Sequence, residues 1–319
     1  MPDPNEFTIR REEVRNGVHL SFVHEGVGRD GERRVPILLV HGYPETKRIW
    51  WRNIAQLVDA GFEVIAPDLR GFGDSDLATD GFYDVAAYSL DLHALVHDVL
   101  GHERSVIVGG DLGGVICYDL ALRYPGWVPR FCFFNTIVPL NPELLEAAGV
   151  SPERPREERL TADYFIRQGS DADALLAELD TPERRRAWIA AMYGHRLWAA
   201  PGHFTPDDVD FMTEPFADAA HLRASWGAYE MSYGARPIED VPKLFEQCHV
   251  PTLALYGADD HVVDPSFPDQ CRAAFTECIG PFVVRNCGHF VQWEAADLLN
   301  TSLRWFCADL LATPGALAR

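Results

Sequence analysis

The stretch Ser105-Val-Ile-Val-Gly-Gly-Asp-Leu-Gly-Gly-Val-Ile-Cys-Tyr118 decides the fold of this chain. Its β-branched residues before Gly109 indicate a buried strand, and the spacing of apolar residues after Asp111 indicates a helix. A residue on a sharp strand-to-helix turn needs small neighbours two positions before and after it. Gly109 and Gly113 hold these two positions, so the pattern predicts a tight turn that presents Asp111 at the end of a strand.

Asp111 has three interpretations on this segment alone. A phosphate-binding loop of the G-x-G-x-x-G kind is disfavoured, because Asp111 stands at the middle glycine position and its charge would repel a pyrophosphate. The carboxylate could cap the helix that follows. It could also act as a nucleophile, and a carboxylate is suited to displacement at a saturated carbon, as in epoxides or alkyl halides. The last two interpretations stay open without further residues.

Strands and helices are expected to alternate on both sides of this turn, which is typical of a parallel sheet covered on both faces. The expected strands are 7–14 and 18–24 (a hairpin around Asn16-Gly17), 35–40, 62–67, 105–108, 130–135, 250–256 and 281–284, and the main expected helices are 49–58, 88–99, 112–124 and 298–311.

The alternation stops between residues 139 and 236, where the chain is helical in pattern, polar and poor in strands. Open sheets place their ligands at the carboxyl ends of the strands, so a helical insertion between two halves of a sheet is interpreted as a lid over them. We therefore expect an α/β core domain of residues 1–138 and 239–319, with a mostly parallel, doubly wound sheet, and a helical cap domain of residues 139–238.

Composition excludes several classes of partner. The net charge of −20 over 319 residues argues against nucleic acid and anionic membranes. Seven cysteines without a C-x-x-C pair predict free thiols in a reducing, cytoplasmic compartment. We expect no signal peptide and no membrane span. No metal site is predicted, because His93 and His97 lie one helical turn apart but no third ligand is evident in the sequence.

Two further side chains follow expected strands at the edge where Asp111 lies. Asp259 and Asp260 come after the strand 250–256, and His289 comes after the strand 281–284. This is the chain order nucleophile, acid, histidine. We favour Asp260 as the acid because it precedes Val263 by three residues. His289 would then activate a water, and Asp260 would fix its tautomer.

An ester formed on Asp111 needs preorganised donors for the oxyanion of its hydrolysis. The backbone amides of Leu112 and Tyr43 are the candidates. Tyr43 belongs to the loop His41-Gly42-Tyr43-Pro44, which directly follows the strand 35–40.

Four motifs together resemble those of the epoxide hydrolases of the α/β-hydrolase fold: His41–Glu45, Asp68–Ser75, Gly109–Gly114 and Gly288-His289. The resemblance covers about residues 7–138 and 239–310. It implies the α/β-hydrolase fold and a cofactor-independent hydrolase, whose partners are a small hydrophobic epoxide and water. It leaves a homodimer open.

The family places two cap tyrosines over the nucleophile, where they donate hydrogen bonds to the epoxide oxygen. By resemblance these are Tyr164, in Asp163-Tyr-Phe-Ile-Arg-Gln-Gly169, and Tyr229, in Arg223-Ala-Ser-Trp-Gly-Ala-Tyr229. An alkoxide leaving group needs this acid assistance, whereas a halide does not. Tyr193 and Tyr233 are the alternatives.

The sequence departs from the family pattern at Leu112, where many epoxide hydrolases have Trp. The similar haloalkane and haloacid dehalogenases share the Asp nucleophile and are the alternative function. They use a Trp or Arg after the nucleophile to hold halide or carboxylate, and Leu112 and Tyr43 lack such donors. A ligand-binding protein without activity is a third hypothesis, and the complete set Asp111, Asp260 and His289 disfavours it.

Overall fold

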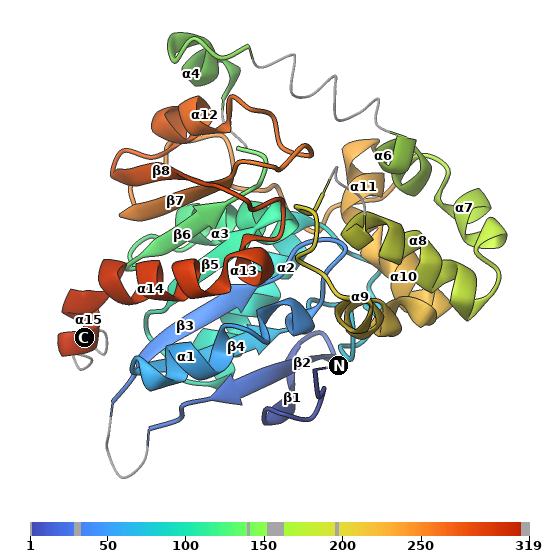
Figure 1. Cartoon of the computed structure of the whole chain (residues 1–319), viewed down its shortest axis with the longest axis horizontal. Helices are drawn as coiled ribbons and strands as arrows, with labels where there is room; N and C mark the ends of the chain where they lie inside the picture. The colour runs from blue at the N-terminus through green and yellow to red at the C-terminus, as the bar shows by residue number, and fades with distance from the viewer. Residues whose placement is uncertain (1, 29–32, 139–140, 152–162, 195–197, 314–319) are drawn as a thin grey trace.

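A single mixed sheet forms the centre of the molecule (Figure 1). The computed structural model describes residues 2–28, 33–138, 141–151, 163–194 and 198–313. Its strands are β1 (Ile9–Arg15), β2 (Val18–Glu25), β3 (Val35–Val40), β4 (Phe62–Pro67), β5 (Val106–Gly110), β6 (Phe131–Phe134), β7 (Thr252–Gly257) and β8 (Cys278–Val284).

The strands lie side by side in the order β1-β2-β4-β3-β5-β6-β7-β8. β1 and β2 form the predicted antiparallel hairpin, and β2 is also antiparallel to β4. All the other pairs are parallel. The hairpin turn is the predicted one, since Asn16 and Gly17 both have positive φ angles, of 51° and 74°.

The core helices cover the sheet on both faces. They are η1 (Lys47–Trp50), α1 (Ile54–Asp59), α2 (Val85–His93), η2 (Ala94–Val99), α3 (Asp111–Arg123), α12 (Phe267–Ala274), α13 (Val291–Glu294), α14 (Ala296–Phe306) and α15 (Ala308–Ala312). Figure 1 shows α1, α13 and α14 in front of the sheet and α2 and α3 behind it. The mostly parallel, doubly wound architecture predicted from the sequence is confirmed.

Three expected helices have different limits. The helix expected at 49–58 is a 3₁₀ turn, η1, followed by α1. The helix expected at 88–99 begins earlier, at Val85, because Asp84 caps the amides of Ala86 and Ala87, and it ends as the π-helix η2. The helix expected at 298–311 is interrupted at Cys307. Periodicity alone does not show caps or changes of helix type.

The region between β6 and β7 contains helices and no described strand. Its helices are α4 (Pro142–Ala147), α6 (Asp163–Gly169), α7 (Ala172–Glu178), α8 (Pro182–Gly194), α9 (Pro206–Thr213), η3 (Glu214–Ala217), α10 (Ala219–Ser225) and α11 (Gly227–Ser232). Helices α6–α11 gather at one end of the sheet, whereas α4 lies beside α12 of the core (Figure 1). The predicted division at 138/139 and 238/239 stays a prediction, and residues 139–140, 152–162 and 195–197 of the predicted cap lie outside the described residues.

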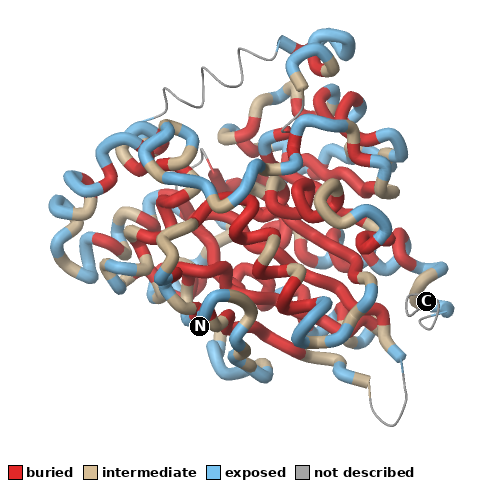
Figure 2. The backbone as a smooth tube through the Cα atoms, turned by 180° about the vertical axis from the view of Figure 1, so that it is seen from behind, coloured by how far each residue is buried: buried red, intermediate tan, exposed pale blue. Residues whose placement is uncertain are grey.

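The central strands of the sheet are buried and red in Figure 2, whereas the edge strands β1 and β8 are mostly exposed or half-buried. Every residue of β3 and β4 is buried, as expected of strands covered on both faces, and this includes Glu63. All seven cysteines are unpaired, and all but Cys278 are buried. Among the described residues, no helix combines the length and the apolar character that crossing a bilayer requires.

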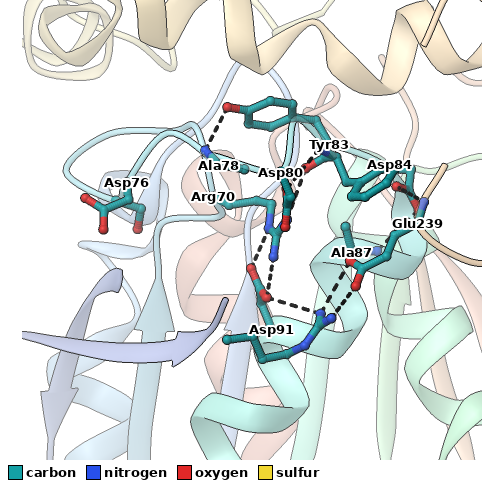
Figure 3. Close-up of polar contacts among 12 residues, drawn as sticks. Arg70, Asp76, Ala78, Asp80, Tyr83, Asp84, Ala87, Asp91 and Glu239 are labelled. Atoms are coloured by element: carbon teal, nitrogen blue, oxygen red, sulfur yellow. Dashed lines mark hydrogen bonds and ion pairs between the residues drawn. The ribbon is translucent and has the colours of Figure 1, made fainter. Parts of the chain in front are cut away.

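The loop Asp68–Ser75 is fixed by a buried arginine (Figure 3). Arg70 donates to both carboxylate oxygens of Asp91 on α2, at 2.6 and 2.7 Å. It also reaches Asp80, at 3.1 Å. Arg15 of β1 bridges Asp91 to Glu239, which follows the helical region. The network therefore joins β1 and α2 to Glu239, the first residue of the predicted second core segment.

Candidate active site

Asp111 lies at a strained turn between β5 and α3. Its φ angle is 49°, in the left-handed region that side chains other than glycine rarely adopt. The predicted small neighbours are required, because a Cβ atom on Gly109 would lie 2.5 Å from the carbonyl oxygen of Gly113. A Cβ atom on Gly113 would lie 2.3 Å from the carbonyl oxygen of Val40. This tight turn places the carboxylate of Asp111 at the carboxyl edge of the sheet, directly after β5.

The structure brings Asp111, His289 and Asp260 together. His289 Nε2 lies 3.2 Å from Asp111 Oδ2, and His289 Nδ1 lies 2.9 Å from Asp260 Oδ2. The other oxygen of Asp260 accepts from the amides of Val262 and Val263, which fixes the carboxylate. The prediction of Asp260 over Asp259 rested on its spacing of three residues from Val263, whose amide binds Asp260 here.

His289 is fully buried between two carboxylates. Burial alone would lower its pKa, but the charges and hydrogen bonds of Asp260 and Asp111 outweigh burial and raise the pKa well above its ordinary value. The resting site therefore favours a protonated His289, whose two N–H groups face the two carboxylates.

The loop after β3 supplies a donor to the carboxylate. The amide of Tyr43 donates to Asp111 Oδ1 at 2.7 Å, as its predicted oxyanion role requires. Leu112, the other predicted donor, follows Asp111 in the first turn of α3, where amides have no acceptor within the helix. No hydrogen bond joins the Leu112 amide to Asp111 among those described.

Buried side chains hold this loop in place. His41 Nδ1 donates to the carbonyl of Gly42, and His41 Nε2 accepts from the amide of Leu69 at 3.0 Å. Burial lowers the pKa of His41 to about 4, so it stays neutral. Glu45 accepts from the amide of Gly42 at 2.6 Å and from Gln292 Nε2 at 2.8 Å. Burial raises the pKa of Glu45 to about 7, and the charge of Asp111 adds to this rise.

Two residues that the sequence analysis missed hold the His289 loop. Asn135 Nδ2 donates to the carbonyls of Gly288 and His289, while Asn135 Oδ1 accepts from the amide of Gly257. Glu294 accepts from the amides of Gly288 and Phe290, at 2.9 and 3.0 Å. The role of Asn135 leaves no local signal in the sequence, because its partners lie more than a hundred residues away. Glu294 lies close to its partners in the chain, but the hydrophobic pattern does not show contacts between a side chain and the backbone.

The predicted cap tyrosines lie near each other. Tyr229 of α11 packs edge-on against the ring of Tyr43, with centroids 5.1 Å apart. The ring centroid of Tyr164, on α6, lies 6.2 Å from that of Tyr229 and 5.2 Å from that of Trp198. The ring of Trp198 in turn packs against His289. Burial, and then the charge of Asp111, raise the pKa of Tyr229 well above its ordinary value, so its hydroxyl keeps its proton.

The two alternative tyrosines have other contacts. Tyr193 of α8 donates its hydroxyl proton to the carbonyl oxygen of Pro44, so it anchors the loop. Tyr233 follows α11 and packs against Phe165, with centroids 6.1 Å apart. Of the four cap tyrosines, Tyr229 borders the cavity described next, whereas Tyr164, Tyr193 and Tyr233 are not among the residues that line it.

A cavity of about 160 Å³ borders Asp111, Tyr43 and Tyr229. Its other walls are mostly apolar, from Val85, Leu112, Val115, Ile137, Phe165 and Met231. A cavity with one carboxylate and two tyrosines at one end and mostly apolar walls elsewhere suits an uncharged ligand with a polar group at that end.

Two groups of side chains elsewhere have a spacing that could hold a metal ion: His24, Glu63 and His102, and His93, His97 and Asp98. The second group supplies a third ligand, Asp98, that the sequence analysis missed. In the first group Arg10 donates to His24 Nδ1, so His24 Nε2 carries the proton and donates to Glu63. In the second group the ring of His93 stacks on that of Tyr124, with centroids 3.6 Å apart, while His97 and Asp98 are exposed. Both groups lie outside the cavity.

The profile of the α/β-hydrolase fold family matches residues 35–296. The chain belongs to this family, and the predicted hydrolase fold and class are confirmed. The solved structure of the epoxide hydrolase CorEH without ligand has the same fold, with a TM-score of 0.78. At 24% identity it covers 96% of this chain and 100% of that chain.

Two relatives that align over about nine tenths of both chains are named epoxide hydrolases, the family that the motifs resemble. The chain is 27% identical over 298 residues to a soluble epoxide hydrolase of Corynebacterium sp. (strain C12), covering 91% of this chain and 94% of that protein. It is 26% identical over 311 residues to an epoxide hydrolase of Caballeronia sordidicola, covering 90% of each. The predicted resemblance to epoxide hydrolases is confirmed.

Proposed function

We propose that this protein is an epoxide hydrolase that converts an epoxide to a vicinal diol through an ester on Asp111. The observation that carries the proposal is a cavity lined by the carboxylate of Asp111 and by Tyr229, with the buried pair of His289 and Asp260 in contact with that carboxylate. The names of the full-length relatives support the same reaction.

Ring opening is the first step. Asp111 Oδ1 stays on the Tyr43 amide, so Oδ2 attacks the epoxide carbon. The bond from that carbon to the ring oxygen breaks, and the oxygen leaves as an alkoxide. Tyr229 and Tyr164 donate hydrogen bonds to it, because an alkoxide is too basic to leave unassisted. The tyrosines pass a proton to the alkoxide and are reprotonated from solvent, so an ester and a free hydroxyl group result.

Ester hydrolysis is the second step. Once Asp111 is esterified, His289 loses one of its two anionic neighbours, so its pKa falls, it releases a proton to solvent and it can act as a base. It removes a proton from water, which attacks the ester carbonyl carbon. The amides of Tyr43 and Leu112 hold the oxyanion. The ester bond then breaks, and the departing alkoxide takes the proton from His289 to complete the diol. The new carboxyl group of Asp111 returns its proton to His289, which restores the resting carboxylate and imidazolium.

The cavity indicates the class of substrate. Its apolar walls favour an uncharged, hydrophobic epoxide, because a charged substituent would lose its hydration without a partner there. A dehalogenase is disfavoured, since Leu112 puts an apolar side chain at the cavity where a halide would need donors. The nearby N–H groups of Gln168 and Trp226 are already bonded to the Tyr43 hydroxyl.

A paired assay tests the proposal. Purified protein is given a panel of hydrophobic epoxides, including styrene oxide, and a matched panel of haloalkanes. We expect diol from the epoxides and no halide release. Halide release without diol would favour the dehalogenase, and binding without turnover of either panel would favour a protein that only binds ligands.

A further inference from the structure

We propose that the phenol of Tyr43 is a positioning residue that sets the two cap tyrosines over Asp111. The inference rests on the proposed function and extends it. The sequence assigned only the backbone amide of Tyr43 to the site, and the structure gives its side chain separate contacts.

The Tyr43 hydroxyl joins the core to two helices of the cap region. It accepts from Gln168 Nε2 of α6 at 2.8 Å and from Trp226 Nε1, at the start of α11, at 3.1 Å. The Gln168 contact persists in either orientation of its amide, because a hydroxyl both donates and accepts. All three side chains are fully buried, so no bulk water replaces these bonds if one partner is removed.

These two partners lie on the same helix faces as the predicted catalytic tyrosines. Tyr164 and Gln168 are four residues apart on α6, and Trp226 and Tyr229 are three residues apart at α11. Residues at these spacings are neighbours on a helix surface. One oxygen atom of the core therefore contacts both helices beside the two tyrosines, and we infer that it sets their position. The edge contact between the rings of Tyr43 and Tyr229 adds to this constraint.

The backbone of Tyr43 is held independently of its hydroxyl. Glu45 binds the amide of Gly42, and Tyr193 donates to the carbonyl of Pro44. Removal of the hydroxyl therefore leaves the Tyr43 amide on Asp111 Oδ1, which ester hydrolysis needs. It releases Gln168 and Trp226, and hence the donors that assist ring opening. The two steps respond differently to the loss of one atom.

Tyr43→Phe is the direct test, with rapid-quench measurement of ester formation and ester decay on styrene oxide. A displacement of about 1 Å in a reacting group costs up to ~10²-fold, so we expect ring opening to slow by one to two orders of magnitude. The rate constant of ester hydrolysis should stay near the wild-type value. A purely structural role would slow both steps, or neither, and either result overturns the inference.

Tyr118→Phe is the matched control. Its hydroxyl is also buried and donates to the carbonyl oxygens of Glu246 and Ala274, away from the cavity. It should lower stability without changing the ratio of the two rate constants. If Tyr43→Phe does not fold, Gln168→Met removes the partner from the cap side and should slow ring opening alone.

The double variant Tyr43→Phe with Gln168→Met completes the cycle. We expect its ring-opening rate to match that of the slower single variant, because both changes break the same contact between Tyr43 and Gln168. Losses that simply add would overturn the inference. A wild type that forms no ester with any epoxide would overturn the proposed function, and this inference with it. Ester formation at equal rates in wild type and Tyr43→Phe overturns the inference alone.

Discussion

Two groups that combine histidine and carboxylate side chains lie at opposite edges of the same sheet. At the carboxyl edge, His289 lies between Asp111 and Asp260. At the amino edge, Glu63 lies between His24 and His102, with its Oε1 2.7 and 3.0 Å from their Nε2 atoms. The first group has one imidazole for two acids, and the second has one acid for two imidazoles.

The difference in stoichiometry gives the groups different chemistry. Burial alone would raise the pKa of Glu63, but the hydrogen bonds and charges of the two histidines lower it to about 2. Two imidazole groups bind the same oxygen of Glu63. Asp111 shares its histidine with Asp260, and its side chain is 20% exposed, toward an apolar cavity. In the proposed mechanism the Asp111 group loses and regains a charge, whereas we expect the Glu63 group to stabilise the fold.

The largest effect is expected from Asp111→Ala, which removes the reacting oxygen. Diol formation should fall by at least ~10⁴-fold, the range seen when a nucleophile is deleted. Circular dichroism should match the wild type, because the positive φ angle at this turn is strained for Asp and Ala alike. Residual turnover above this limit would assign the chemistry to another residue.

His289→Gln should stop the second step and leave the first. Loss of a general base costs about 10²–10⁴-fold, so the ester on Asp111 should accumulate. Intact mass spectrometry after addition of styrene oxide should show one adduct per chain. If no adduct forms while diol formation is lost, the two-step scheme is wrong, or His289 is also needed for ring opening.

Replacement of both Tyr164 and Tyr229 by Phe should slow ring opening by about 10²–10⁴-fold, since acid assistance to the alkoxide is lost. Single-turnover ester formation is the measurement. The replacement of both Tyr118 and Tyr233 by Phe is the control, because neither lines the cavity and Tyr193, which anchors the carbonyl of Pro44, stays in place. Equal losses from both pairs would mean that packing, and not proton donation, explains the effect.

The smallest effect on turnover is expected from Glu63→Gln, which should leave diol formation unchanged. It should lower the free energy of unfolding at pH 7 by about 1–3 kcal/mol, as for hydrogen bonds to a charged group. The folded pKa of about 2 lies below that of an unfolded Glu. The stabilisation is therefore complete above the unfolded pKa and is lost as the pH falls toward 2.

Urea unfolding at pH 7 and at pH 3.5 measures this contribution. The difference between wild type and Glu63→Gln should shrink at the lower pH. Glu103 is exposed and lines the same surface hollow as Glu63. Glu103→Gln is therefore the control and should show no such change. A loss of turnover in Glu63→Gln would contradict the separation of the two groups.

Local patterns predicted most of the core. The predicted strands 35–40 and 62–67 match β3 and β4 residue for residue, because strands buried on both faces are mostly apolar along their whole length. Asp111, Asp260 and His289 were found because each lies in the loop or turn that follows the end of a strand. Asn135 was missed because it binds backbone atoms of a distant loop, and Glu294 because contacts between a side chain and the backbone leave no hydrophobic pattern. The side chain of Tyr43 was missed because its partners lie 125 and 183 residues away.

The central claim is that the oxygen added to the substrate comes first from the carboxylate of Asp111. The most direct test is a single turnover in water enriched in ¹⁸O, with enzyme in excess and mass analysis of the diol. The account predicts an unlabelled diol, with the ¹⁸O label retained in Asp111. A diol that carries solvent ¹⁸O from the first turnover would contradict it.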